Sequence, residues 1–109
     1  MSSEVTAVSK FSPICAIDRL NIGTPTQFEL DGRPICLLRT DEDVIAFEDR
    51  CPHRGHPLSE GKCVDGILRC ALHGWEYSIP EGEAVSPRAP FTLELLELRI
   101  EDGRVGVVS

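Results

Sequence analysis

The chain has 109 residues, of which 41% are hydrophobic and 27% are charged, so it holds enough apolar material for one packed domain. Its 18 acidic and 11 basic residues give a net charge of −7, which disfavours nucleic acid and anionic membranes as partners because both bind clustered Lys and Arg. Since no apolar stretch approaches the length of a membrane span and no secretory signal follows Met1, we expect a single domain over residues 1–109 in the cytoplasm.

Short apolar runs separated by turn residues predict β-strands along most of the chain. Asp31-Gly32 lies between two such runs and indicates a hairpin. The segment 75–79 alternates apolar and polar residues, as a half-buried strand does. In chain order, the expected strands cover residues 27–30, 35–38, 44–47, 67–69, 75–79, 93–100 and 104–108, with a second hairpin at Asp102-Gly103.

Two of the later segments need separate arguments. The segment 79–91 contains three prolines and a glycine, so we expect a loop. In residues 93–100 the alternation shifts at Leu95-Leu96, which fits a bulged strand or a short helix, and we favour the strand because a hairpin follows it. The chain as a whole predicts an all-β fold, either a small antiparallel β-sandwich or a partly open barrel.

Two short segments each combine one cysteine with one histidine. Cys51 and His53 are separated by one residue, and Cys70 and His73 are separated by two. Each segment therefore offers one thiolate and one imidazole, and together they supply two sulfurs and two nitrogens. That ligand set suits a two-iron, two-sulfide cluster in which thiolates hold one iron and imidazoles hold the other.

The segments CPHRGHPLSEG (51–61) and CALHGWEY (70–77) resemble the cluster-binding motifs of the Rieske [2Fe–2S] proteins. This resemblance implies that Cys51 and Cys70 bind one iron. It also implies that His53 and His73 bind the iron that accepts the electron, and that both imidazoles reach the surface. One Rieske domain with two cluster-binding hairpin loops is the fold that it implies. The sequences of the two motifs are more similar to those of the Rieske domains of oxygenase large subunits than to those of many shuttle ferredoxins.

The same resemblance indicates the redox potential. High-potential Rieske proteins carry a disulfide at the positions that His56 and Leu72 occupy here, and a supporting serine hydroxyl at the position of Trp75. Tyr77 matches a tyrosine of that pattern, and we expect its hydroxyl to donate to a ligand sulfur. With fewer donors to sulfur, we expect a potential of roughly −150 mV, at the low end of the Rieske range.

A Cys₂His₂ zinc site is an alternative use of the same four residues. Structural zinc sites usually pair like ligands, whereas each pair here is mixed, so the cluster is favoured. A Cys–His nucleophile would use only one of the two pairs, and a haem attachment site would need a further cysteine before His73. We expect His56 not to be a ligand, because the Cys-x-His spacing selects His53.

The remaining cysteines and aromatic residues have structural interpretations. Cys15 and Cys36 lie in apolar runs and Cys63 lies between the motifs, and we expect all three to pack in the core. Trp75 either shields the cluster or anchors the core, which is the commoner role of a lone tryptophan. The stretch 87–90 resembles the proline loop that covers the cluster in this family, and an ordinary surface loop is the alternative.

Rieske clusters serve membrane-anchored respiratory subunits, oxygenase subunits and free-standing ferredoxins. The first class would need a membrane span and the disulfide, and the second would need a two-histidine, one-carboxylate iron site for which only His56 remains. We therefore expect a monomeric one-electron carrier that transforms no substrate. Its expected partners are a flavin-containing NAD(P)H reductase and a terminal aromatic-ring-hydroxylating oxygenase. The alternative is a non-redox module, either a zinc-binding Rieske-like fold or a regulatory subunit of a larger oxidoreductase.

Overall fold

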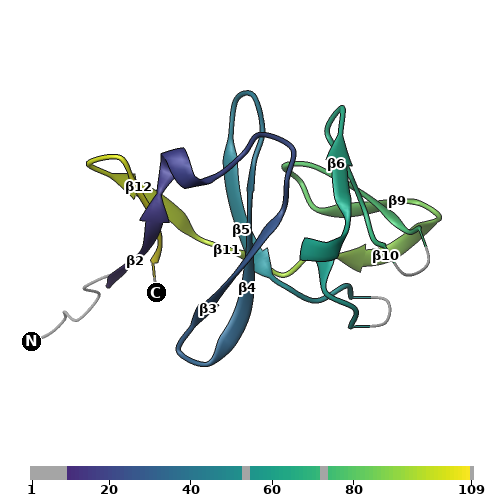
Figure 1. Ribbon diagram of the computed structural model, residues 1–109. Helices are drawn as coiled ribbons and strands as arrows, with labels where there is room; N and C mark the ends of the chain where they lie inside the picture. Colours follow the sequence, from purple (N-terminus) through teal and green to yellow (C-terminus); the bar gives the residue numbers. More distant parts are fainter. Residues whose placement is uncertain (1–9, 53–54, 72–73, 109) are drawn as a thin grey trace, which may run out of the picture.

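Three antiparallel β-sheets make up the computed structural model, which describes residues 10–52, 55–71 and 74–108. The three-stranded, four-stranded and five-stranded sheets follow one another from left to right in Figure 1. The described part contains two short 3₁₀ turns but no α-helix, and it has no helix with the length and apolar character that a membrane span requires. The predicted all-β fold is confirmed, as separate sheets rather than a closed barrel.

The four-stranded sheet lies in the middle and contains the first predicted hairpin. Asp31 and Gly32 adopt φ values of 52° and 80°, which is the backbone conformation of the two-residue turn that best follows the strand twist. This hairpin and the strand predicted over residues 44–47 are confirmed. In sheet order the strands are β11 (Leu95–Leu96), β5 (Val44–Glu48), β4 (Arg33–Arg39) and β3 (Thr26–Leu30).

The three-stranded sheet contains the second predicted hairpin, which turns at Asp102-Gly103 with φ values of 51° and 75°. A strand that the sequence analysis did not predict, β2, pairs with the other edge of the last strand. It is followed by the 3₁₀ turn η1 (Ile17–Arg19). In sheet order the strands are β12 (Leu98–Glu101), β13 (Arg104–Val108) and β2 (Phe11–Ala16).

The five-stranded sheet lies next to both cysteine motifs. The turn η2 (Leu58–Glu60) lies near the end of the first motif and leads into the sheet, whereas the second motif begins where the strand over residues 67–69 ends. Its strands at residues 67–69 and 76–78 confirm two of the predicted strands. In sheet order the strands are β10 (Arg88–Thr92), β9 (Glu83–Ser86), β8 (Glu76–Ser78), β7 (Ile67–Arg69) and β6 (Lys62–Val64).

Strand β4 is buried on both faces, and its alternating side chains therefore enter two different cores. Ile35 and Leu37 pack with residues of the three-stranded sheet, such as Val105. Cys36 and Leu38 pack with residues of the five-stranded sheet and with the two motif cysteines. The side chains of these four residues, at positions 35–38 of β4, are fully buried. Burial of one aliphatic side chain stabilises a fold by about 1.5–3 kcal/mol. The central sheet thus fixes the cysteine-bearing half of the molecule to the other half.

The loop predicted over residues 79–91 is wrong, because β9 and β10 form a hairpin within it. Proline was the reason for predicting a loop, yet Pro90 lies inside β10. This strand is the edge of the five-stranded sheet, where a missing N–H removes no inner ladder bond. The pairing is irregular between Arg88 and Thr92, so the edge strand accommodates Pro90 in a bulged stretch, and Pro87 lies in the turn between the two strands.

The single strand predicted over residues 93–100 is also wrong. Its first part, β11, pairs with β5, whereas β12 pairs with β13 in another sheet. Leu93, ahead of both, is buried, and its N–H donates to the carbonyl of Gly82 at 2.8 Å. The shift in alternation at Leu95-Leu96 therefore precedes the change of sheet, which falls at Glu97 between β11 and β12, and it is not a bulge within one strand.

Candidate metal centre

The first loop, residues 51–57, is folded by two backbone hydrogen bonds that both involve Cys51. The N–H of Cys51 donates to the carbonyl of His56 at 2.8 Å, and the N–H of Gly55 donates to the carbonyl of Cys51 at 2.6 Å. Gly55 has a φ of 78°, a conformation that residues with a side chain rarely adopt. The loop therefore turns back on itself directly after the cysteine.

The second loop, residues 70–75, repeats this backbone pattern. The N–H of Cys70 donates to the carbonyl of Trp75 at 2.8 Å, and the N–H of Gly74 donates to the carbonyl of Cys70 at 3.0 Å. Gly74 also has a positive φ, 70°. The two cysteines thus hold equivalent positions in two loops with the same backbone hydrogen bonds. This arrangement is expected of a metal centre whose ligands come from two loops.

Both loop cysteines are turned toward the core between the four-stranded and five-stranded sheets. Cys51 is 1% exposed and Cys70 is 3% exposed. The hydroxyl of the fully buried Tyr77 lies 3.1 Å from the Sγ of Cys51, so the expected contact between this hydroxyl and a motif sulfur is present. When Cys51 is a thiolate, Tyr77 is the donor, because a thiolate has no proton to give.

Two buried thiols on matched loops, one of them bonded to a hydroxyl donor, fit an iron–sulfur cluster. Such clusters are held by thiolates, and hydrogen bonds to their sulfurs tune the potential. Cys51 and Cys70 belong to the same hydrophobic cluster, which is compatible with a shared site. His53 and His73, the two predicted nitrogen ligands, lie outside the described residues, so the full set of four stays a prediction.

His56 and Cys63 have contacts that do not involve a metal. The Nε2 of His56 lies 3.0 Å from the Oε1 of Glu60, in the turn η2. Cys63 packs in the core, and burial raises the pKa of its thiol, which disfavours the metal-binding thiolate. Among the described residues, no three His, Cys, Asp or Glu side chains gather as a possible metal site. Neither residue therefore completes a three-ligand set with Cys51 and Cys70.

Cys15 and Cys36 are buried in the two cores, and with Cys63 they confirm the predicted packing roles. Burial raises the pKa of the Cys15 and Cys36 thiols. For Cys36, the nearby carboxylate of Asp49 adds to this effect. These thiols therefore stay protonated and behave as small apolar side chains.

Asp49 is a residue of this region that the sequence analysis missed. It lies directly after β5 and two residues before Cys51, and it is 3% exposed. The signal that points to it is the period of two along a strand, because Phe47 and Asp49 fall on the same side of the extended chain and Phe47 is fully buried. A carboxylate on that side needs hydrogen-bond partners inside the protein.

Trp75 links the end of the second loop to the β9–β10 hairpin. It is half-buried and packs on the core that contains both motif cysteines, which agrees with a core role. Its ring centroid lies 5.6 Å from that of Phe91 in β10, and the two rings are tilted by 52°. Phe91 directly follows the stretch 87–90 that resembles the covering loop of the family, so the chain next to that stretch lies against the second loop.

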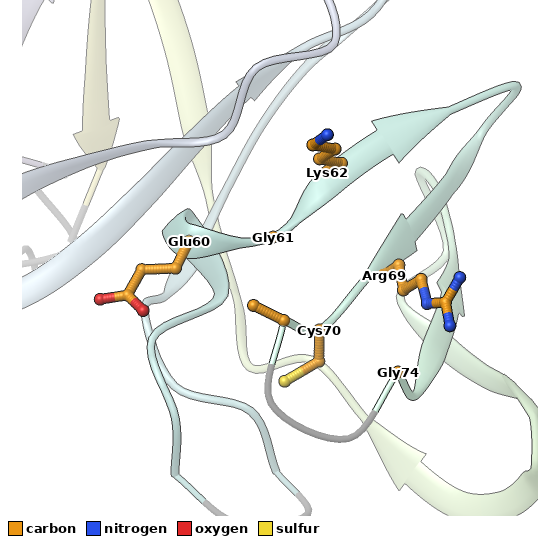
Figure 2. Close-up of a pocket in the computed structure, with 7 residues that line it drawn as sticks. Glu60, Gly61, Lys62, Arg69, Cys70 and Gly74 are labelled. Atoms are coloured by element: carbon orange, nitrogen blue, oxygen red, sulfur yellow. The ribbon is translucent and has the colours of Figure 1, made fainter.

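A surface hollow of about 460 Å³ opens beside the second loop (Figure 2). Lys62 and Arg69 face each other across β6 and β7, and in Figure 2 both side chains point away from the thiol of Cys70. The Arg69 guanidinium lies close to Gly74, since a Cβ at that glycine would come within 3.0 Å of Nη2. The hollow is lined by Glu60, Gly61, Lys62, Arg69, Cys70, Ala71 and Gly74.

Comparison with known proteins shows relatives along nearly the whole chain. The ferredoxin component of the alkene monooxygenase system of Xanthobacter autotrophicus is 31% identical over 97 residues, which cover 88% of this chain and 79% of the relative. The anthranilate 1,2-dioxygenase ferredoxin subunit of Burkholderia cepacia is 32% identical over 103 residues, which cover 92% of this chain and 93% of the relative.

A longer relative matches over a shorter part. The chloroplastic pheophorbide a oxygenase of Arabidopsis thaliana is 38% identical over 87 residues, but the match spans only 16% of its length. This match agrees with the similarity between the motif sequences of this chain and the Rieske domains of oxygenase large subunits.

The fold is likewise shared with a solved structure. One chain in the complex of reduced oxygenase and oxidized ferredoxin in carbazole 1,9a-dioxygenase has a TM-score of 0.80 and 26% identity, with 89% of this chain and 91% of that chain covered. The family model of the Rieske [2Fe-2S] domain matches residues 10–96, which include both loops. The chain belongs to the Rieske [2Fe–2S] domain family, and its cofactor is one Rieske-type [2Fe–2S] cluster.

Proposed function

We propose that residues 1–109 form one Rieske domain that works as a monomeric one-electron carrier and not as an enzyme. It receives electrons from a flavin-containing NAD(P)H reductase and passes them to a terminal aromatic-ring-hydroxylating oxygenase. Its ligands are Cys51, His53, Cys70 and His73. The observation that carries this proposal is the repeated loop design, which brings the thiols of Cys51 and Cys70 into one core.

The described residues of the chain hold and shield the cofactor. When bound, the cluster takes up and releases a single electron. Cys51 and Cys70 supply the thiolates from loops that their own backbone hydrogen bonds keep closed. With Cys51 as a thiolate, the fully buried Tyr77 hydroxyl donates to its Sγ. Trp75, at the end of the second loop, contacts the ring of Phe91, and this contact would limit the access of water from that side.

The names of the relatives support the proposed partners. The two relatives that match along most of both chains are named as ferredoxin parts of oxygenase systems, one a monooxygenase and one a dioxygenase. The similar solved chain comes from a complex of an oxygenase with a ferredoxin. A carrier of 109 residues that matches these ferredoxin components along most of their length fits between a reductase and such an oxygenase.

We also propose that the protein works in the cytoplasm. Cys15, Cys36 and Cys63 are buried thiols outside any disulfide, which is usual in a reducing compartment.

An anaerobic electron titration tests the carrier function. Dithionite should deliver one electron per chain. NADH should reduce the protein only after a flavin-containing ferredoxin reductase is added. The reduced protein should be reoxidised by a terminal oxygenase in the presence of its aromatic substrate and oxygen. Uptake of two electrons per chain, or turnover of the aromatic compound by this chain alone, would contradict the proposal.

The Tyr77→Phe variant should have a lower midpoint potential than the wild type, which we place at roughly −150 mV. Removing the hydroxyl 3.1 Å from the Cys51 sulfur removes a donor that favours the more negative, reduced cluster. A hydrogen bond worth about 1 kcal/mol corresponds to about 40 mV in a one-electron couple. Redox titration followed by visible absorption measures the shift, and an unchanged or raised midpoint would show that this contact does not tune the cluster.

A further inference from the structure

The two cluster loops are closed at their bases in different ways. The second loop joins β7 and β8, which pair directly, with Arg69 opposite Glu76 at the base of the loop. The first loop follows β5 of the four-stranded sheet and leads through η2 into β6 of the five-stranded sheet. Since β5 and β6 belong to different sheets, a strand ladder cannot hold the base of the first loop together.

Asp49 supplies a side-chain bridge at this place. Its Oδ1 accepts a hydrogen bond from the backbone N–H of Ser59 at 2.8 Å. Its Oδ2 accepts one from the Oγ of Ser59 at 2.6 Å and one from the Nε2 of Gln27 at 2.6 Å. All three partners donate, which matches a carboxylate that can only accept. Asp49 is 3% exposed, and its bonds to the half-buried Ser59 and to the exposed Gln27 are partly buried.

The position of this bridge matters because its two ends flank the first loop. Asp49 precedes Cys51 by two residues, and Ser59 follows Pro57 at the other end of the loop. The backbone of Asp49 is fixed in turn, since its N–H donates to the carbonyl of Pro34 in β4 at 3.1 Å. The bridge therefore ties both ends of the loop to the central sheet, and Gln27 adds a tie to β3.

We propose that Asp49 is a positioning residue for the metal centre: it closes the base of the first loop and thereby holds Cys51 in place to bind the cluster. This inference rests on the ligand set of the proposed function. Metal ligands must be held close to their binding geometry by neighbours that are themselves fixed, and the loss of such a neighbour weakens metal binding. Without the bridge, the described residues of the first loop keep their two backbone hydrogen bonds and the contacts of Cys51 with Tyr77 and of His56 with Glu60, but they lose the bond that joins the two ends of the loop.

The test measures how fast the holoprotein loses its cluster. Wild-type protein and the Asp49→Ala, Asp49→Asn and Ser59→Ala variants are mixed anaerobically with an iron chelator, and the visible absorption is followed. The Asp49→Ala variant should lose the cluster about ten- to hundredfold faster than the wild type, the usual range for loss of a residue that supports a ligand. The Asp49→Asn and Ser59→Ala variants keep part of the bridge and should lie between the two.

Two control variants separate this role from general destabilisation. Glu94→Gln removes the exposed bond between Glu94 and Arg50, next to Asp49, and should leave the rate of cluster loss unchanged. Val107→Ala opens a cavity in the core between the three-stranded and four-stranded sheets. This core does not contain either motif cysteine. The substitution lowers the unfolding temperature without touching the bridge, so its cluster loss should stay close to the wild-type rate.

Each outcome bears on a different claim. If Asp49→Ala and Ser59→Ala lose the cluster no faster than Val107→Ala at equal distance below their unfolding temperatures, the positioning role is wrong. If Asp49→Ala does not fold, the same comparison made with Ser59→Ala and Asp49→Asn decides. If the wild type itself binds no iron–sulfur cluster, the proposed function fails, and the inference fails with it.

Discussion

The His53→Ala variant should lose the native cluster, whereas the His56→Ala variant should keep it. His53 supplies one of the two proposed imidazoles, and an alanine leaves one iron a ligand short. His56 instead contacts Glu60 at 3.0 Å on the surface side of η2. Iron content and the visible spectrum of the two purified proteins, prepared in parallel, give the comparison.

The pair of variants is informative because both histidines lie in the same loop. A His56→Ala protein without the cluster beside a His53→Ala protein with it would reverse the ligand assignment. A Cys63→Ala variant adds a thiol control, since Cys63 packs in the core and should not be needed for the cluster.

The Gly61→Ala variant should unfold far more easily than the wild type and should not retain the cluster. A Cβ at residue 61 would overlap the carbonyl oxygen of Arg69 and would lie 3.2 Å from the carbonyl oxygen of Leu58. Both are backbone atoms, so a rotamer change cannot relieve the clash. We expect a loss of about 3 kcal/mol or more, the upper end of overpacking penalties. In a domain of this size, that lowers the unfolding temperature by more than about 10 °C.

The link to the metal centre is that Arg69 directly precedes Cys70. Any shift of the Arg69 backbone moves the start of the second loop. Gly32→Ala is the matched control: Gly32 has a φ of 80°, but a Cβ there meets no atom within 4 Å. Its cost is limited to the backbone strain of about 1–2 kcal/mol. Thermal unfolding followed by circular dichroism compares the two, and equal unfolding temperatures would show that the approach of Gly61 to the carbonyl of Arg69 is looser than described.

Local turn chemistry made part of the fold predictable. Asp31-Gly32 and Asp102-Gly103 adopt the positive φ values that aspartate and glycine tolerate. Two adjacent residues are therefore enough to predict each of these hairpins. The pair Asp65-Gly66 has the same signal, with φ values of 53° and 76°, and joins β6 to β7, although the sequence analysis did not use it.

Features that depend on distant pairing were not predictable in this way. Pro90 reads as a strand breaker unless one knows that β10 is an edge strand. The segment 93–100 changes sheets at Glu97, and only the partners β5 and β13 reveal it.

The candidate site also combines features that local sequence predicts with features that depend on distant residues. The spacing of the two motifs predicted Cys51 and Cys70 as a pair of candidate ligands. The family resemblance predicted the contact between the hydroxyl of Tyr77 and a motif sulfur, which is that of Cys51. The role of Asp49 was not predictable, because its partners Gln27 and Ser59 lie 22 and 10 residues away in the chain. The period of two places Asp49 on the buried side of the chain, but only the folded structure shows which donors surround its carboxylate.

Electron paramagnetic resonance on anaerobically purified protein, before and after dithionite, tests most directly whether this chain holds a histidine-ligated [2Fe–2S] cluster. The account predicts no signal from the oxidised protein and a rhombic signal of low average g from the reduced protein, with iron and sulfide in equal amounts. Silence in both states, with zinc in place of iron, would contradict it and would leave a Rieske fold without electron transfer.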